Sequence, residues 1–173
     1  MNGAERRKRI AALLDSKEPI TGTELSKKLG VSRQIIVQDI ALMRADDKNI
    51  LSTNKGYLLY DSNNYAGSCR RVLHVRHTTE QVLDELLTIA ELGGKILDVS
   101  VEHELYGQIR VDLLINTPQD AIEFSKRLES SNGEPLKILT GDDHYHTVIA
   151  NSERLLDLIE AELQKKRILI EEE

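Results

Sequence analysis

Two histidines separated by one residue, His144 and His146, are the residues in this sequence whose types and spacing most clearly suggest chemistry. They follow the turn-forming segment Gly141–Asp143 and lead into Thr147–Ala150, whose composition is typical of a β-strand. Side chains alternate between the two faces of a strand, so both imidazoles are expected on one face. Two imidazoles on one face supply most of a transition-metal site.

A third histidine and a carboxylate lie upstream and complete a candidate ligand set. His77 immediately precedes Thr78-x-x-Gln81, which has the form of a capping box that opens an amphipathic helix. Glu85 lies two turns into this helix at the rim of its apolar stripe, from which it reaches the same pocket if the helix packs against a sheet. Taken alone, His77 is better interpreted as a helix-flanking residue and Glu85 as a solvated one. Together with the histidine pair they suit Zn²⁺, Ni²⁺ or Fe²⁺.

The distribution of charge separates the two ends of the chain, although the net charge of the 173 residues is -6. Residues 1–60 carry 11 Lys and Arg against 7 Asp and Glu, a net +4, whereas residues 61–173 carry 12 against 22, a net -10. The N-terminal part is therefore expected to meet a polyanion. The single cysteine, Cys69, excludes an intrachain disulfide, and the chain has neither a secretory signal nor an apolar run of membrane-spanning length, so a cytoplasmic location is expected.

The first sixty residues have the pattern of a winged helix-turn-helix domain. The predicted elements are helices over 5–14, 21–30 and 33–45 and strands over 50–53 and 57–60. Thr21-x-x-Glu24 is a capping box, Gly30 ends the second helix, and Ser32 is the expected N-cap of the third. In this architecture the third helix enters the major groove of double-stranded DNA.

The residues expected to contact DNA lie at the start of the third helix and in the wing. Arg33, Gln34 and Gln38 have side chains that read guanine or adenine edges in the major groove. Ser32 suits a phosphate at the helix N-terminus, and Lys55 at the wing tip suits the DNA backbone, as does the basic run Arg6–Arg9. Each residue alone is also explained as part of a solvated surface.

The rest of the chain predicts a polar linker, 61–68, and a second domain, 69–173. Strands are expected over 69–75, 95–103, 106–116, 136–140, 145–150 and 167–170, and helices over 78–92, 119–130 and 152–165. This mixed order predicts a small α+β domain with an antiparallel sheet and helices on one face. The whole chain is therefore expected to be α+β, with a winged helix-turn-helix followed by this domain.

Three motifs of the second domain carry a family resemblance: Arg76–Thr79 through Glu85, Val99–Gly107, and Gly141–Thr147. Together with the helix-turn-helix, which resembles that of the biotin-operon-repressor and DeoR-like groups, they resemble the niacin-responsive transcriptional repressors of the NiaR type, whose C-terminal part is the three-histidine (3H) domain. The resemblance implies a homodimeric repressor of NAD-biosynthesis or niacin-uptake genes with nicotinic acid as corepressor. It also implies a divalent metal, Zn²⁺ or Ni²⁺, held by residues matching His77, Glu85, His144 and His146.

The effector is expected to be held by further polar residues of the second domain. His103, between Glu102 and Glu104, and Arg110 are candidates to bind the ring nitrogen or a carboxylate oxygen of nicotinic acid. Two other functions remain open. One is a regulator in which the metal is itself the signal, and the other is a metal-dependent hydrolase of nicotinate-like compounds.

Overall fold

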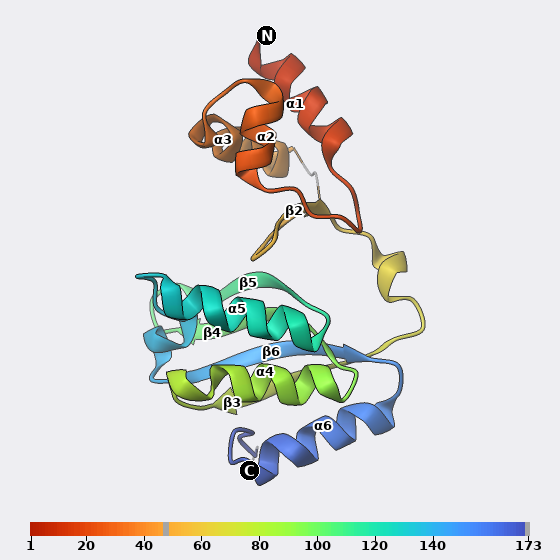
Figure 1. The fold of residues 1–173 in the computed structure, drawn as a ribbon, viewed down its shortest axis with the longest axis vertical. Helices are drawn as coiled ribbons and strands as arrows, with labels where there is room; N and C mark the ends of the chain where they lie inside the picture. The colour runs from red at the N-terminus through yellow and green to blue at the C-terminus, as the bar shows by residue number, and fades with distance from the viewer. Residues whose placement is uncertain (47–48, 172–173) are drawn as a thin grey trace. The chain divides into compact units, whose positions relative to one another are not determined.

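The computed structural model describes residues 1–46 and 49–171, which divide into two compact units, Met1–Ala66 and Gly67–Glu173 (Figure 1). The boundary lies within the expected linker 61–68. Part of that segment, Ser62–Tyr65, is nevertheless a short 3-10 helix, η1, because the Asp61 side chain accepts the backbone N–H of Asn63 at 2.9 Å. The last two residues of the expected second domain, 172–173, lie outside the described residues.

The first unit has the predicted winged helix-turn-helix architecture. Its elements are α1 (Gly3–Leu13), α2 (Gly22–Leu29), α3 (Arg33–Ala45), β1 (Ile50–Thr53) and β2 (Gly56–Leu59). Thr21 and Glu24 form the predicted capping box, Gly30 has a left-handed backbone (φ 67°), and the Ser32 hydroxyl accepts the N–H of Ile35. A core that includes Ile10, Leu25, Ile36, Ile40 and Met43 holds the three helices together.

A buried ion cluster links α1 to α3. The Asp39 carboxylate is buried and accepts hydrogen bonds from the Arg6 and Arg7 guanidinium groups. Arg9 pairs with Glu5 on the same helix at 3.2 Å. Two members of the basic run 6–9 thus neutralise a buried carboxylate and fix the packing of the first helix. That the run contacts phosphates stays a prediction.

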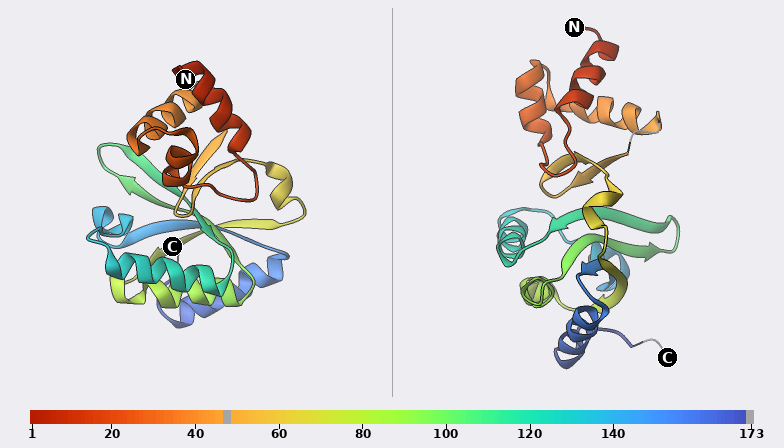
Figure 2. Two further views of the ribbon diagram at one scale, coloured as in Figure 1. Left: turned by 45° about the horizontal axis from the view of Figure 1, so that its top comes forward. Right: turned by 90° about the vertical axis from the view of Figure 1, so that its right-hand side faces the viewer.

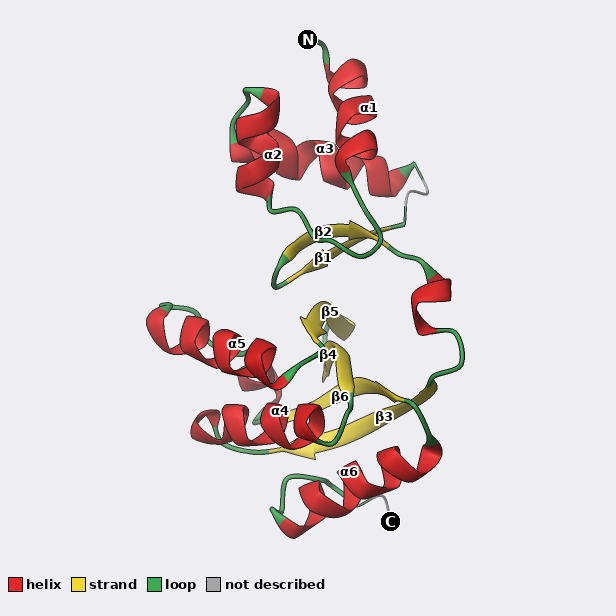
Figure 3. Ribbon diagram, turned by 45° about the vertical axis from the view of Figure 1, so that its right-hand side comes forward, coloured by secondary structure: helices red, strands yellow, loops and turns green. Residues whose placement is uncertain are grey.

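The second unit is a four-stranded antiparallel sheet with helices on one face, as predicted (Figures 2 and 3). Its strands are β3 (Cys69–Arg76), β4 (Lys95–His103), β5 (Gly107–Ile115) and β6 (Asp143–Ala150), in the order β3-β6-β4-β5. Its helices are η2 (Thr79–Gln81), α4 (Val82–Glu91), α5 (Pro118–Ser130), η3 (Leu136–Thr140) and α6 (Glu153–Lys165). The core lies between the sheet and α4, α5 and α6.

Two segments predicted as strands fold differently. Residues 136–140 form the 3-10 helix η3, because Pro135 begins the turn and Gly141, with φ 60°, ends it. Residues 167–170 do not form a strand: Arg167 has φ 58°, and Leu169 makes only an isolated bridge to Val75 of β3. Within the described residues, none of the helices combines the length and apolarity that a membrane crossing requires.

Candidate metal centre and adjoining cavity

Strand pairing places the two histidines of β6 on the face that the helices cover. In the antiparallel β3–β6 ladder, His144 is paired with Val75 and His146 with Leu73, both of which belong to the core. His77 lies one residue beyond the end of β3, and Glu85 lies on α4, which packs against the same face. The four side chains come from β6, from α4 and from the residue that follows β3, and all four are buried.

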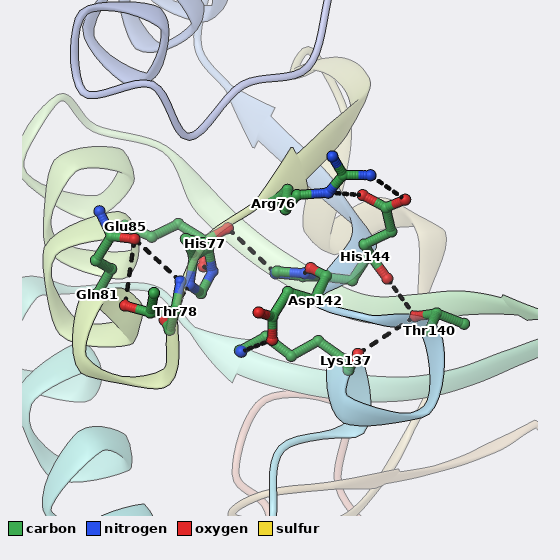
Figure 4. Close-up of polar contacts among 10 residues, drawn as sticks. Arg76, His77, Thr78, Gln81, Glu85, Lys137, Thr140, Asp142 and His144 are labelled. Carbon is green, nitrogen blue, oxygen red and sulfur yellow. Dashed lines mark hydrogen bonds and ion pairs between the residues drawn. The ribbon is translucent and has the colours of Figure 1, made fainter.

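The inward-facing atoms of these residues converge on the Glu85 carboxylate. His77 Nε2 lies 2.5 Å from Glu85 Oε2, whereas His146 Nε2 and His144 Nε2 lie 3.1 Å and 3.6 Å from Oε1. Ligand atoms of His77, Glu85 and His144 all lie within 4.8 Å of one another. Figure 4 shows His77, Glu85 and His144 close to one another, together with the turn that carries His144.

Each imidazole is oriented from behind by a backbone carbonyl. His77 Nδ1 donates to the Thr78 carbonyl (2.7 Å), His144 Nδ1 to that of Asp142 (2.8 Å) and His146 Nδ1 to that of Asp98 (2.7 Å). A carbonyl can only accept, so every Nδ1 carries a hydrogen, and in the neutral ring every Nε2 presents its lone pair to the centre. This pattern is the one that orients histidines as metal ligands.

Three Nε2 lone pairs and the Glu85 carboxylate therefore face one another as hydrogen-bond acceptors. A donor or positive charge enters this centre only if an imidazole is protonated or a cation binds. Glu85 Oε1 is buried and has no hydrogen-bond partner, although His146 Nε2 is close to it. Burial raises the pKa of Glu85, but the neighbouring imidazoles outweigh burial and hold its pKa well below the ordinary value. Glu85 is thus an anion in a buried site, which is costly without a positive partner.

The electrostatics of the two β6 histidines differ. Burial lowers the pKa of His144, with a smaller opposing effect from Glu85. Burial also lowers the pKa of His146, but the Glu85 carboxylate and the Asp98 carbonyl more than offset it and raise that pKa above 6.5. In the metal-free protein His146 therefore takes a proton more readily than His144.

The four histidine and glutamate residues predicted from the sequence come together, but Glu85 lies deeper than expected. It was placed at the rim of the apolar stripe and is in fact 1% exposed. Its helix rotates this face toward the sheet, where Val82, Leu86 and Ile89 also pack. The carboxylate is thus enclosed by the protein rather than solvated.

His103 and Arg110 do not reach this centre. His103 ends β4, where its Nδ1 accepts the backbone N–H groups of Leu105 (3.1 Å) and Tyr106 (3.3 Å) and so caps the β4–β5 turn. Arg110 projects from the sheet face opposite to the core, where it pairs with Asp98 and Asp112 at 2.8 Å. Arg110 is thus on the face opposite to the metal ligands, because neighbours along β5 alternate between the two faces, and His103 lies at the β4–β5 turn. That these two residues hold an effector stays a prediction.

A cavity of about 70 Å³ adjoins the candidate metal centre. Besides the four ligand candidates, its wall consists of mostly apolar side chains: Val82, Leu86, Val99, Leu113, Phe124, Pro135, Leu136 and Lys137. Lys137 was missed by the sequence analysis because a lysine in an apolar segment is ordinarily assigned to the surface. The cavity offers a place for a small, largely apolar ligand next to the three imidazoles.

The DNA-binding candidates occupy the expected places in the first unit. Ser32, Arg33, Gln34 and Gln38 are exposed on and before α3. Lys55 lies at the turn between β1 and β2 and is half-buried, with its backbone N–H bonded to the Thr53 hydroxyl at 3.2 Å. The side chains at the start of α3 are therefore accessible to base edges.

Comparison with known proteins places the chain in a family. The profile of the 3H domain matches residues 70–172, and that of a helix-turn-helix domain matches residues 6–58. A Thermotoga maritima protein named probable transcription repressor NiaR is 41% identical over 169 residues, covering 97% of this chain and 95% of that protein. A Bacillus subtilis protein named transcription repressor NadR is 36% identical over 172 residues, covering 98% of this chain and 96% of that protein.

The fold and the site define a DNA-binding winged helix-turn-helix protein with a histidine-bearing α+β domain. At this identity and coverage the chain belongs to the 3H-domain family of transcription repressors that includes NiaR and NadR.

Proposed function

We propose that the protein represses NAD-biosynthesis or niacin-uptake genes, with nicotinic acid as corepressor and a divalent transition metal in the 3H domain. The observation that carries this proposal is the convergence of three Nε2 atoms and the Glu85 carboxylate beside an apolar cavity. Membership of the repressor family supports the DNA-binding part of the proposal.

The residues present suit a metal ion. The Glu85 Oε1 atom without a hydrogen-bond partner and the three imidazoles held by backbone carbonyls form a donor set that a divalent cation would complete. Nitrogen-rich sets with one carboxylate suit Zn²⁺ or Ni²⁺. The ion would be held by His77, Glu85, His144 and His146, and would supply a positive charge next to the cavity.

The cavity limits the effector to a small molecule. A volume of about 70 Å³ holds a few waters, since one water needs roughly 10–15 Å³ on the same measure. Cavities for larger ligands such as dinucleotides are several times larger. The apolar wall, including Phe124 and Leu86, suits one face of a single aromatic ring. A pyridine carboxylate satisfies both conditions.

A homodimer would convert ligand binding into a change in DNA affinity. Two recognition helices bind two half-sites only if their spacing matches that of the operator. Nicotinic acid would act as a corepressor by binding more tightly to the dimer whose spacing fits; a ligand that bound both forms equally would change nothing.

The proposal is tested by a gel shift on an operator selected from random duplex DNA. Metal-loaded and chelator-stripped protein are each assayed with and without nicotinic acid. Tight binding that needs both the metal and nicotinic acid is the expected result. Binding that responds to the metal alone shows that the metal is the signal, and binding indifferent to both contradicts the proposed regulation.

A further inference from the structure

Lys137 is buried in a segment that exposes its apolar neighbours. A short helix at the protein surface ordinarily buries its aliphatic side chains and leaves its lysine in water. In η3 the pattern is reversed: Lys137 is 2% exposed, whereas Ile138 and Leu139 are 44% and 55% exposed. Exposing two large aliphatic groups and burying an ammonium group is unfavourable for folding, so the position of Lys137 has a different explanation.

The partner of Lys137 is less enclosed than Lys137 itself. Its ammonium group pairs with the carboxylate of Asp142, as Figure 4 shows, and the Asp142 side chain is 37% exposed. Asp142 can therefore turn into solvent at little cost, while Lys137 requires a partner inside the protein. Lys137 also lines the cavity beside the imidazoles, so an anion in that cavity can take the place of Asp142.

The charges around the cavity favour a monoanion. A divalent ion next to the Glu85 carboxylate leaves one uncompensated positive charge, and Lys137 and Asp142 neutralise each other. A ligand with one carboxylate balances that charge, whereas its neutral amide does not. At Lys137, the carboxylate of such a ligand can therefore replace the carboxylate of Asp142.

We propose that Lys137 selects a carboxylate over the corresponding amide: the ligand carboxylate replaces that of Asp142 on the Lys137 ammonium group. This proposal rests on the proposed function, in which a pyridine carboxylate occupies the cavity. The exchange takes place at the turn that orients a metal ligand, because the Asp142 carbonyl accepts from His144 Nδ1 and the Asp142 N–H donates to the Lys137 carbonyl at 3.0 Å. Nicotinic acid is thereby distinguished from nicotinamide by one residue.

The experiment is calorimetric titration of full-length, metal-loaded protein with nicotinic acid and with nicotinamide. Lys137→Met, which keeps the length of the side chain and removes its charge, is expected to weaken nicotinic acid binding about 10- to 100-fold, the weight of a charge-assisted hydrogen bond. Binding of nicotinamide is expected to change by less than about 3-fold, since it gains little from the charge. An unchanged affinity for nicotinic acid overturns the role of Lys137.

A second variant tests the exchange without altering a buried side chain. Asp142→Asn keeps the backbone carbonyl and removes the competing anion, so nicotinic acid is expected to bind about 2- to 5-fold more tightly, the weight of a partly exposed ion pair. Weaker binding contradicts the exchange.

Metal content and wild-type binding separate this proposal from the proposed function. Both variants are expected to retain the wild-type metal content, because neither side chain belongs to the candidate ligand set. A loss of metal that parallels the loss of affinity in Lys137→Met shows a structural role and overturns the proposal. If the wild-type protein binds neither compound, the proposed function fails as well, whereas wild-type binding that Lys137→Met leaves unchanged overturns only the selection by Lys137.

Discussion

The imidazole of His146 donates its Nδ1 hydrogen to the backbone carbonyl of Asp98, 2.7 Å away on the neighbouring strand β4. The register of β4 is irregular here, with a shift between Ile96 and Asp98 in its pairing with β5. Such bulges release backbone groups from the ladder and redirect them. The Asp98 carboxylate fixes the local geometry by accepting the Thr147 N–H at 2.9 Å and the Arg110 guanidinium at 2.8 Å.

Asp98 is therefore expected to act as a positioning residue for the metal centre. Replacing it with alanine loosens the strand that orients His146, so we predict about a 10- to 100-fold loss of metal affinity, the usual effect of losing a group behind a ligand. Asp112→Ala is the matched control, because Asp112 also pairs with Arg110, whereas the carbonyl that holds His146 belongs to Asp98. Equal metal affinities of the two variants in a competition titration with a chromogenic chelator contradict this role.

Glu85→Gln is predicted to raise the stability of the metal-free protein at alkaline pH, where His146 is unprotonated, and to abolish its stabilisation by metal. The amide N–H groups can donate to Nε2 lone pairs that face only acceptors in the native site, and a buried charge is removed. The free energy of unfolding in chelator is expected to rise by about 1–3 kcal/mol. Thermal melts with chelator and with Ni²⁺ measure both effects. If the metal-free variant is less stable than the metal-free wild type, the centre does not consist of acceptors alone.

Stabilisation by metal is predicted to increase with pH. Burial lowers the pKa of His146, but Glu85 raises it further, to above the ordinary 6.5. The stability that protonated His146 contributes through Glu85 is therefore present below pH 6.5 and is lost as pH rises through the raised pKa. Metal ligands must be unprotonated, so the metal-induced rise in Tm should grow between about pH 6 and 8. A rise that shrinks with pH over this interval is the opposite of the prediction.

Substitutions in the DNA-binding unit should separate base contacts from phosphate contacts. Arg33→Ala is expected to weaken operator binding by about 1–3 kcal/mol and to relax selection at one base pair. Lys55→Ala is expected to weaken binding to all duplexes similarly and to reduce the slope of log affinity against log salt by about 1. Fluorescence anisotropy over a salt series distinguishes the two, and a uniform effect of Arg33→Ala on all sequences contradicts base contact.

Local chemistry made much of the fold predictable from the sequence. Capping residues such as Thr21 and Ser32 begin helices where expected, since each side chain accepts an unpaired N–H of the first turn. The alternation of apolar residues over 95–103 predicted β4, because successive side chains of a strand point to opposite faces of the sheet. The strand prediction for 136–140 was wrong. The apolar residues of this segment suggested a strand, whereas Pro135 and Gly141 confine it to the 3-10 helix η3.

The metal ligands were easier to predict than the cavity beside them. Histidine is scarce and chemically distinctive, so His144 and His146 stood out, and their shared face follows from strand geometry. Lys137 carries no such signal, because its burial results from the packing of η3 against the sheet. Arg110 was assigned to the ligand from its charge alone, and its face of the sheet became apparent only from the register of β5 with β4.

The central claim, that four residues hold one divalent ion, is tested most directly by metal stoichiometry. Chelator-stripped protein is incubated with Ni²⁺ or Zn²⁺, freed of excess ion by gel filtration, and analysed by inductively coupled plasma mass spectrometry, with His144→Ala and His74→Ala in parallel. His74 stacks on Tyr145 and lies outside the candidate ligand set. One ion per chain in the wild type and in His74→Ala, with loss in His144→Ala, is the predicted result. Metal retained by His144→Ala to the same extent as by the wild type, or no ion bound to the wild type, contradicts the account.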